Sequence, residues 1–203
     1  MAIKRLLATI TILGLLVFPA AFAGAIPFTY QMGANSSVDT SGTNSALEMQ
    51  ATLNPNLSNI IFSLDVGQST SFRFARIGTN ESWINPDDLK PGTITAHVDF
   101  ANPDITQSVG GTSIGFTGCL YFTQGWNLVW NDPVIANFGN GGQFALQLSD
   151  ATHSRGLWLG PSGSEWIQAT VTHNSTPVPE PATMLLLGSG LVGLIGFRRK
   201  FIE

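Results

Sequence analysis

The chain has 203 residues, of which 43% are hydrophobic and 11% are charged. Soluble globular domains typically carry about 25% charged residues, so we expect a surface that is polar but largely uncharged. Most basic residues lie at the two ends, and residues 25–176 hold four basic and 11 acidic residues, which gives a formal charge of −7. This acidic body excludes nucleic acid as a partner, and the length favours one domain with accessory segments.

The first 23 residues have the organisation of a secretory signal peptide. A short basic region precedes an uncharged apolar run from residue 6 to 18. Ala21 and Ala23 then satisfy the small-x-small rule for cleavage by signal peptidase. We expect cleavage after Ala23, with Ala25 as the alternative. A retained anchor is disfavoured because the apolar run ends in a proline and a cleavage site.

Residues 24–175 are predicted to form an all-β ectodomain. Several segments alternate apolar and polar residues with period two, which is typical of half-buried antiparallel strands. These segments are 57–66, 71–76, 94–100, 143–149 and 166–171. Turn-forming Gly, Pro and Asn residues separate them, and no segment has the pattern of a long amphipathic helix. We therefore predict an antiparallel β-sandwich of about eight to ten strands, jelly-roll-like in class.

Two tryptophans are candidates for binding sugar. Trp126 and Trp130 share parity with Leu128, so a strand would turn all three side chains to one face. Core packing is the default for such residues, and a platform that stacks on sugar rings is the alternative. Trp126 and Trp130 are therefore the tentative sugar-binding residues, whereas Trp158 is expected in the core.

An oxygen-rich loop offers a weak candidate for a metal site. Asp87 and Asp88 follow Asn85 and Pro86, and carboxylates are ligands that Ca²⁺ prefers. The spacing matches no defined calcium loop. The favoured interpretation is a solvated turn or a short helical turn capped by Asn85. We expect no bound metal and no cofactor.

No catalytic signature is found in the sequence. His97, His153 and His173 lie far apart and lack the spacing of metal ligands. A pair of acid–base carboxylates stays open, because their separation is a three-dimensional quantity. Cys119 is the single cysteine, so no intrachain disulfide can form, and its apolar neighbours predict a buried side chain. We therefore expect a protein that is not an enzyme.

The C-terminus combines a proline-rich linker, an apolar span and a basic tail. Residues 176–181 form an extended spacer that can continue neither a strand nor a helix. Residues 182–197 are uncharged and predict a transmembrane helix of roughly 24 Å, somewhat short for a bilayer core of about 30 Å. The tail 198–203 begins with Arg198, Arg199 and Lys200, which predict a stop-transfer signal that stays in the cytoplasm.

Val178, Pro179, Glu180 and Pro181, followed by the apolar span and the basic tail, closely resemble the PEP-CTERM sorting signal. The resemblance covers the last 26 residues. It implies that the four residues are recognised by exosortase, a transpeptidase-like cysteine protease of the inner membrane in Gram-negative bacteria that make exopolysaccharide. It also implies that the tail is removed, and that the periplasmic ectodomain passes from the inner membrane to the cell surface or extracellular matrix. A plain single-span anchor is the alternative.

The leading hypothesis is therefore an exported surface or matrix protein, structural or adhesive in a biofilm. Its processing partners would be signal peptidase and an exosortase-like membrane protease, and exopolysaccharide is a candidate ligand. One alternative is a carbohydrate-binding module, which requires exposed tryptophans on one sheet face. Another is a secreted hydrolase, which requires a cleft with converging carboxylates or histidines.

Overall fold

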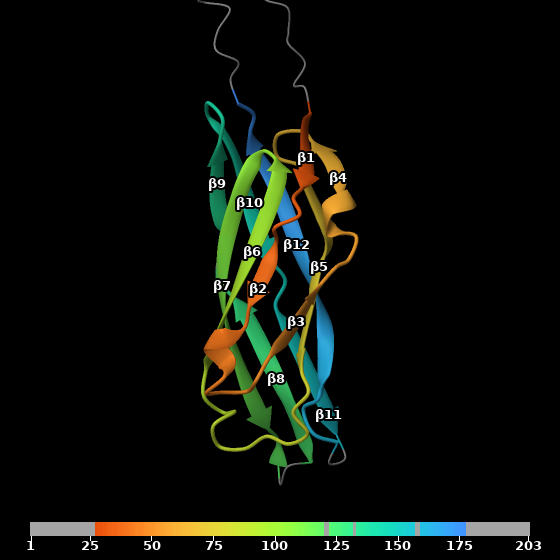
Figure 1. Cartoon of the computed structure of the whole chain (residues 1–203), viewed down its shortest axis with the longest axis vertical. Coiled ribbons are helices and arrows are strands. Elements are labelled where there is room, and N and C mark those ends of the chain that lie inside the picture. Colours follow the sequence, from red (N-terminus) through yellow and green to blue (C-terminus); the bar gives the residue numbers. More distant parts are fainter. Residues whose placement is uncertain (1–26, 120–121, 132, 157–158, 178–203) are drawn as a thin grey trace, which may run out of the picture.

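The computed structural model describes residues 27–119, 122–131, 133–156 and 159–177. These residues form an elongated body of antiparallel strands, and the first and last of them lie at the same end (Figure 1). The described chain contains twelve strands and two short 3-10 helices, η1 (Ser41–Thr43) and η2 (Leu57–Asn59). The all-β, antiparallel prediction is confirmed, and the jelly-roll assignment stays a prediction.

Seven strands form one antiparallel sheet, in the order β11-β8-β7-β6-β1-β4. The seventh strand, β2, pairs with β6 beside β1. The bounds are β1 (Phe28–Met32), β2 (Ser37–Asp39), β4 (Ile61–Leu64), β6 (Gly92–Asn102), β7 (Asp104–Thr117), β8 (Thr123–Trp130) and β11 (Ala151–Gly156).

Five strands form a second antiparallel sheet, in the order β3-β5-β12-β10-β9. The bounds are β3 (Gln50–Leu53), β5 (Ser69–Thr79), β9 (Val134–Phe138), β10 (Gly142–Leu148) and β12 (Gly163–Ser175). The strands β5 and β12, which pair over most of their length, form the centre of this sheet.

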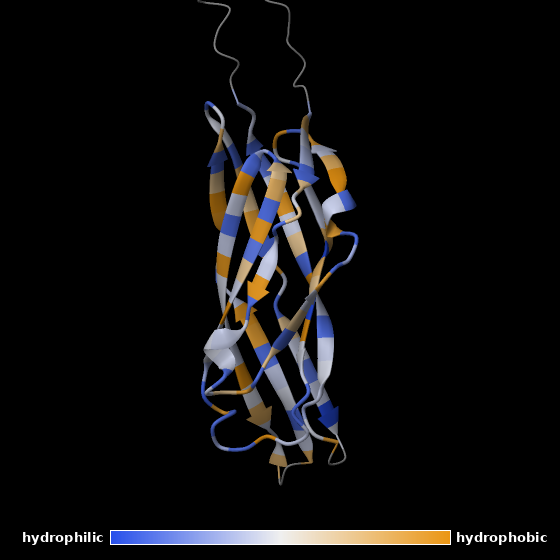
Figure 2. Ribbon diagram, in the orientation of Figure 1, coloured by the Kyte–Doolittle hydropathy of each residue, from blue (hydrophilic) through white to orange (hydrophobic). Residues whose placement is uncertain are grey.

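Period-two alternation places one face of each sheet in a shared core. Hydrophobic and hydrophilic residues alternate along the strands in Figure 2. The predicted inward residues of β6 and β10 are buried, as the alternation requires. The Phe144 ring of the five-stranded sheet lies 5.0 Å from that of Phe100 and 5.6 Å from that of Tyr30, and both partners belong to the seven-stranded sheet. Edge-to-face aromatic packing therefore joins the two sheets.

Three details of the sequence analysis are wrong. The strand count is twelve rather than eight to ten. The segment 57–66 is not one strand, because the side-chain Oδ1 of Asn54 accepts a hydrogen bond from the N–H of Asn56 and the chain enters η2 before β4 begins. Cys119 is exposed, since it follows the end of β7 rather than lying inside a strand.

A β-bulge in β5 changes the facing of its arginines. Arg73 pairs with Gln168 and Ala75 pairs with Ile167, so Phe74 is an extra residue with no partner in the register. Phe74 and Ala75 are both buried, and Arg73 and Arg76 are both exposed. The extra residue shifts the alternation by one, which turns both arginines to the outer face of the five-stranded sheet.

Candidate functional site

The last strand carries the chain to the predicted linker at the end of the molecule where the turn between β9 and β10 lies (Figure 1). Ser175 donates a hydrogen bond from Oγ to the carbonyl oxygen of Gly141 at 2.8 Å. Pro177 packs on the same turn, because a Cβ added to Gly142 would lie 2.7 Å from its Cγ, and one added to Gly139 would lie 3.2 Å from its Cβ. The first residues of the linker are therefore part of the folded body.

A buried polar pair anchors this end of β12. The phenol oxygen of Tyr30 lies 2.6 Å from Nδ1 of His173, and Nε2 of His173 lies 3.0 Å from Oγ1 of Thr176. Both rings are fully buried. Burial raises the pKa of Tyr30, so its phenol stays neutral. His173 therefore bridges Tyr30 of β1 and Thr176 of the linker through its two ring nitrogens.

The environment of His173 keeps its imidazole neutral. Burial lowers the pKa of His173, and the nearby charge of Asp65 opposes that effect. The ring also stacks on Phe28, with centroids 5.7 Å apart and an interplanar angle of 16°. The sequence did not predict this arrangement, because Tyr30 and His173 are 143 residues apart.

The processing signals lie outside the described residues. They include the cleavage-site residues Ala21 and Ala23, and the sorting and stop-transfer residues Val178, Pro179, Glu180, Pro181, Arg198, Arg199 and Lys200. The predicted helix 182–197 also lies there. Among the residues that are described, no helix is long and apolar enough to cross a membrane.

The tentative sugar platform at Trp126 and Trp130 is wrong. The predicted shared parity holds, but the shared face is the core, and Trp126 is 0% and Trp130 6% exposed. Neither ring has a free face for a sugar. Trp83 and Trp166 are the exposed tryptophans among those described, at 41% and 38%, and Trp158 lies outside the described residues.

The loop at Asp87 and Asp88 forms a capped turn, as its favoured interpretation predicted. Oδ1 of Asn85 accepts a hydrogen bond from the N–H of Asp87 at 3.2 Å, and Oδ2 of Asp88 accepts one from the N–H of Asn85 at 2.7 Å. Asp88 is buried, and desolvation raises its pKa. Within the described ranges, no group of three or more His, Cys, Asp or Glu residues is placed to hold a metal ion.

The three histidines have separate surroundings. Nδ1 of His97 lies 2.9 Å from Oγ of Ser108 on the neighbouring strand β7. Nδ1 of His153 lies 2.8 Å from Oε1 of Glu165, and its ring stacks on Trp126. The register of β11 on β8 places His153 opposite Trp126. The contact between His153 and Glu165 joins the two sheets, because Glu165 belongs to β12. The three histidines therefore have different hydrogen-bond partners.

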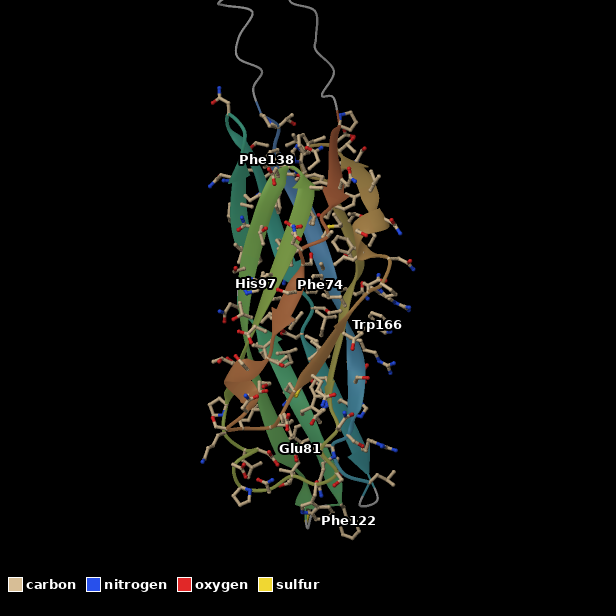
Figure 3. The ribbon with its side chains drawn as sticks, viewed as in Figure 1. Phe74, Glu81, His97, Phe122, Phe138 and Trp166 are labelled. Atoms are coloured by element: carbon tan, nitrogen blue, oxygen red, sulfur yellow. The ribbon has the colours of Figure 1, made fainter. Side chains whose placement is uncertain are left out.

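An exposed polar surface on the five-stranded sheet was missed by the sequence analysis. Arg76 lies between Thr52 of β3 and Trp166 of β12 in the register. The guanidinium carbon of Arg73 lies 5.3 Å from the centre of the Trp166 ring. We call this set, Thr52, Arg73, Arg76 and Trp166, the arginine face. Figure 3 labels Trp166 at the outer edge of the molecule.

The arginine face continues into an open hollow of about 260 Å³. Its lining is Gln50, Thr52, Arg76, Gly78, Thr79, Asn80, Gly163 and Ser164. The side chains that can reach a ligand there are amides, hydroxyls and one guanidinium. This lining suits a hydrogen-bonding ligand rather than an apolar one.

Comparison with known families identifies the tail. Residues 177–200 match the family model of the PEP-CTERM protein-sorting motif. The chain therefore carries this sorting signal, as its resemblance implied. Comparison with curated proteins and with solved structures finds no match for the chain.

Proposed function

We propose that the chain is a surface or extracellular-matrix protein with a structural or adhesive role and no catalytic activity. The PEP-CTERM motif at residues 177–200 carries the proposal, because it marks an exported protein with a membrane-anchored sorting signal for exosortase. The proposed structural or adhesive role rests on the β-rich domain that precedes this signal. Two antiparallel sheets with one core support a sandwich, jelly-roll-like in class.

The sequence supports an order of processing steps. Signal peptidase removes residues 1–23, and the apolar span 182–197 holds the protein in the inner membrane with the basic tail inside. Exosortase then recognises Pro179, Glu180 and Pro181 and releases the body to the cell surface. Because Pro177 packs on the folded body, the motif follows the fold with almost no spacer, so the protease works directly beneath the domain.

The exposed chemistry of the body supports a matrix role. Hydroxyl pairs join β5 to β12 on the outer face, with Ser69 to Thr172 and Ser71 to Thr170 both at 2.8 Å between oxygens. Such uncharged groups exchange hydrogen bonds readily with water and with the hydroxyls of polysaccharides. An exopolysaccharide matrix is therefore the setting that we propose for the mature protein.

Replacing Glu180 by glutamine tests the proposal. We expect Glu180→Gln to stay full-length and membrane-bound in an exosortase-containing host, because the recognition motif loses its carboxylate. Glu203→Gln is the matched control, since it makes the same change outside the matched residues 177–200, and we expect its processing to equal that of the unaltered chain. Normal processing of Glu180→Gln would refute the assigned recognition role.

A further inference from the structure

The arginine face is a positive surface on an acidic body. Residues 25–176 have a formal charge of −7 and only four basic residues, two of which lie on this face. Within the described chain, the one ion-pair geometry joins His153 to Glu165, so neither Arg73 nor Arg76 is neutralised by a described carboxylate. The bulge at Phe74 is what brings the two guanidiniums to the same side.

The surrounding sheet contains almost no negative charge. All five strands of this sheet are described, and Glu165 is the only acid in their sequences. Its carboxylate lies 2.8 Å from Nδ1 of His153 on the other sheet, so it is engaged away from the arginines. Glu48 and Glu81 line a separate hollow that shares Gln50 and Asn80 with the first. An anion is therefore favoured on the part of the arginine face near Arg73. It is disfavoured at the end of the hollow near Asn80, where Glu48 and Glu81 lie close by.

The two arginines suit a carboxylate. A guanidinium presents a planar fork of donors that matches the two oxygens of a carboxylate. Trp166 holds Arg73 over its ring at 5.3 Å, which limits the freedom of that side chain before any ligand binds. Arg76 pairs with Trp166 in the register, so both arginines lie near this tryptophan on the outer face.

The rest of the outer face suits the hydroxyl groups of sugars. Gln50, Thr52 and Gln168 are exposed beside the arginines, and the Ser71–Thr170 and Ser69–Thr172 pairs continue along β5 and β12. Each of these groups both donates and accepts hydrogen bonds. From Ser69 to Arg76 the strand spans about 23 Å, which is longer than one sugar ring. The surface is therefore long enough to contact several sugar units of a polymer.

We propose that this face binds a polysaccharide that carries carboxylate groups, with Arg73 and Arg76 at the carboxylates and the hydroxyl and amide side chains along the chain of sugars. The inference deepens the proposed matrix role and rests on it. It replaces the buried Trp126 and Trp130 with a site on the opposite sheet, where the charges and exposure match the ligand.

Binding of polygalacturonate to the full chain in mild detergent tests the proposal. We expect binding at low salt that weakens as salt is added. Carboxyl-reduced polygalacturonate, which keeps the sugar backbone and loses the charge, should bind roughly tenfold more weakly or worse. Free galacturonate should also bind more weakly than the polymer, because it reaches only one end of the face.

Arginine variants locate the site. Arg73→Gln and Arg76→Gln should each lower the affinity roughly tenfold, whereas the control Arg155→Gln, in the exposed edge strand β11, should leave it unchanged. The midpoint of thermal unfolding should shift by no more than about 4 °C for all three, since their side chains are exposed and the Arg73–Trp166 contact is a small contribution. Equal binding of the reduced polymer, equal binding of free galacturonate, no binding at low salt, or retention of affinity by Arg76→Gln would overturn the proposal. Tail processing is measured separately, so failure of binding and failure of sorting give different results.

Discussion

Tyr30→Phe tests whether the buried pair at the end of β12 stabilises the fold. The substitution removes one oxygen and keeps the aromatic ring that packs against Phe62, Phe100 and Phe144. The lost group is the phenol that lies 2.6 Å from Nδ1 of His173. The imidazole then keeps a buried nitrogen with no partner, so the change isolates the hydrogen bond from the ring packing.

The magnitude follows from the burial of both partners. Leaving a buried polar atom without a partner costs about 1–3 kcal/mol. For a domain of this size, each 1 kcal/mol shifts the midpoint of thermal unfolding by about 2–4 °C. We therefore expect Tyr30→Phe to lower the free energy of unfolding by about 2 kcal/mol and the midpoint by about 4–8 °C.

Urea unfolding of the full chain, followed by tryptophan fluorescence, measures this loss. Trp126 and Trp130 are buried, so their emission reports the opening of the core. Thr170→Val is the control, because it removes a hydroxyl from the exposed pair with Ser71, and it should cost less than about 0.5 kcal/mol. If Tyr30→Phe costs no more than this control, the buried pair does not stabilise the fold as argued.

Two further predictions concern the same end of the molecule. Because the pKa of His173 in the folded chain lies below its ordinary 6.5, the unfolded chain binds more protons between the two pKa values, and the free energy of unfolding should fall as pH drops from 6.5 towards the lowered pKa. In urea titrations at a series of pH values, His173→Gln should flatten this dependence. An unchanged dependence on pH would contradict the assignment. Gly142→Ala should cost about 1–3 kcal/mol and expose the linker to proteases, because its Cβ would lie 2.7 Å from both the Phe138 carbonyl oxygen and Pro177; Gly156→Ala, whose Cβ would meet nothing closer than 3.8 Å, is the control, and equal digestion of both would refute the packing role.

Local patterns in the sequence predicted parts of β4, β5, β6, β10 and β12, and the inward faces of β6 and β10. In β6 and β10 the alternation identified the buried residues, because β6 pairs with β7 and β10 pairs with β9 without a shift in register. The prediction failed in β5, where Phe74 interrupts the alternation. In the sequence, Phe74 and its neighbours have the pattern of an uninterrupted strand. The sequence of one strand does not reveal which of its residues lacks a partner on the neighbouring strand.

Parity predicts which residues share a face of a strand, but it does not predict whether that face points to the core or to solvent. Trp126 and Trp130 do share a face, but only the packing of the second sheet decides that this face is the core. The Tyr30–His173 pair, the His153–Glu165 pair and the arginine face depend on strand pairings between distant segments. The sorting motif could be predicted from the sequence, because its parts are consecutive in the chain, and residues 177–200 match the PEP-CTERM motif.

The mass of the mature protein tests the central claim most directly. Intact-mass spectrometry of the protein from the cell surface of an exosortase-containing host defines both ends of the chain at once. The account predicts a chain that lacks residues 1–23 and ends upstream of Ala182, after removal of the apolar span and the basic tail. A surface protein that still ends at Glu203 would contradict it.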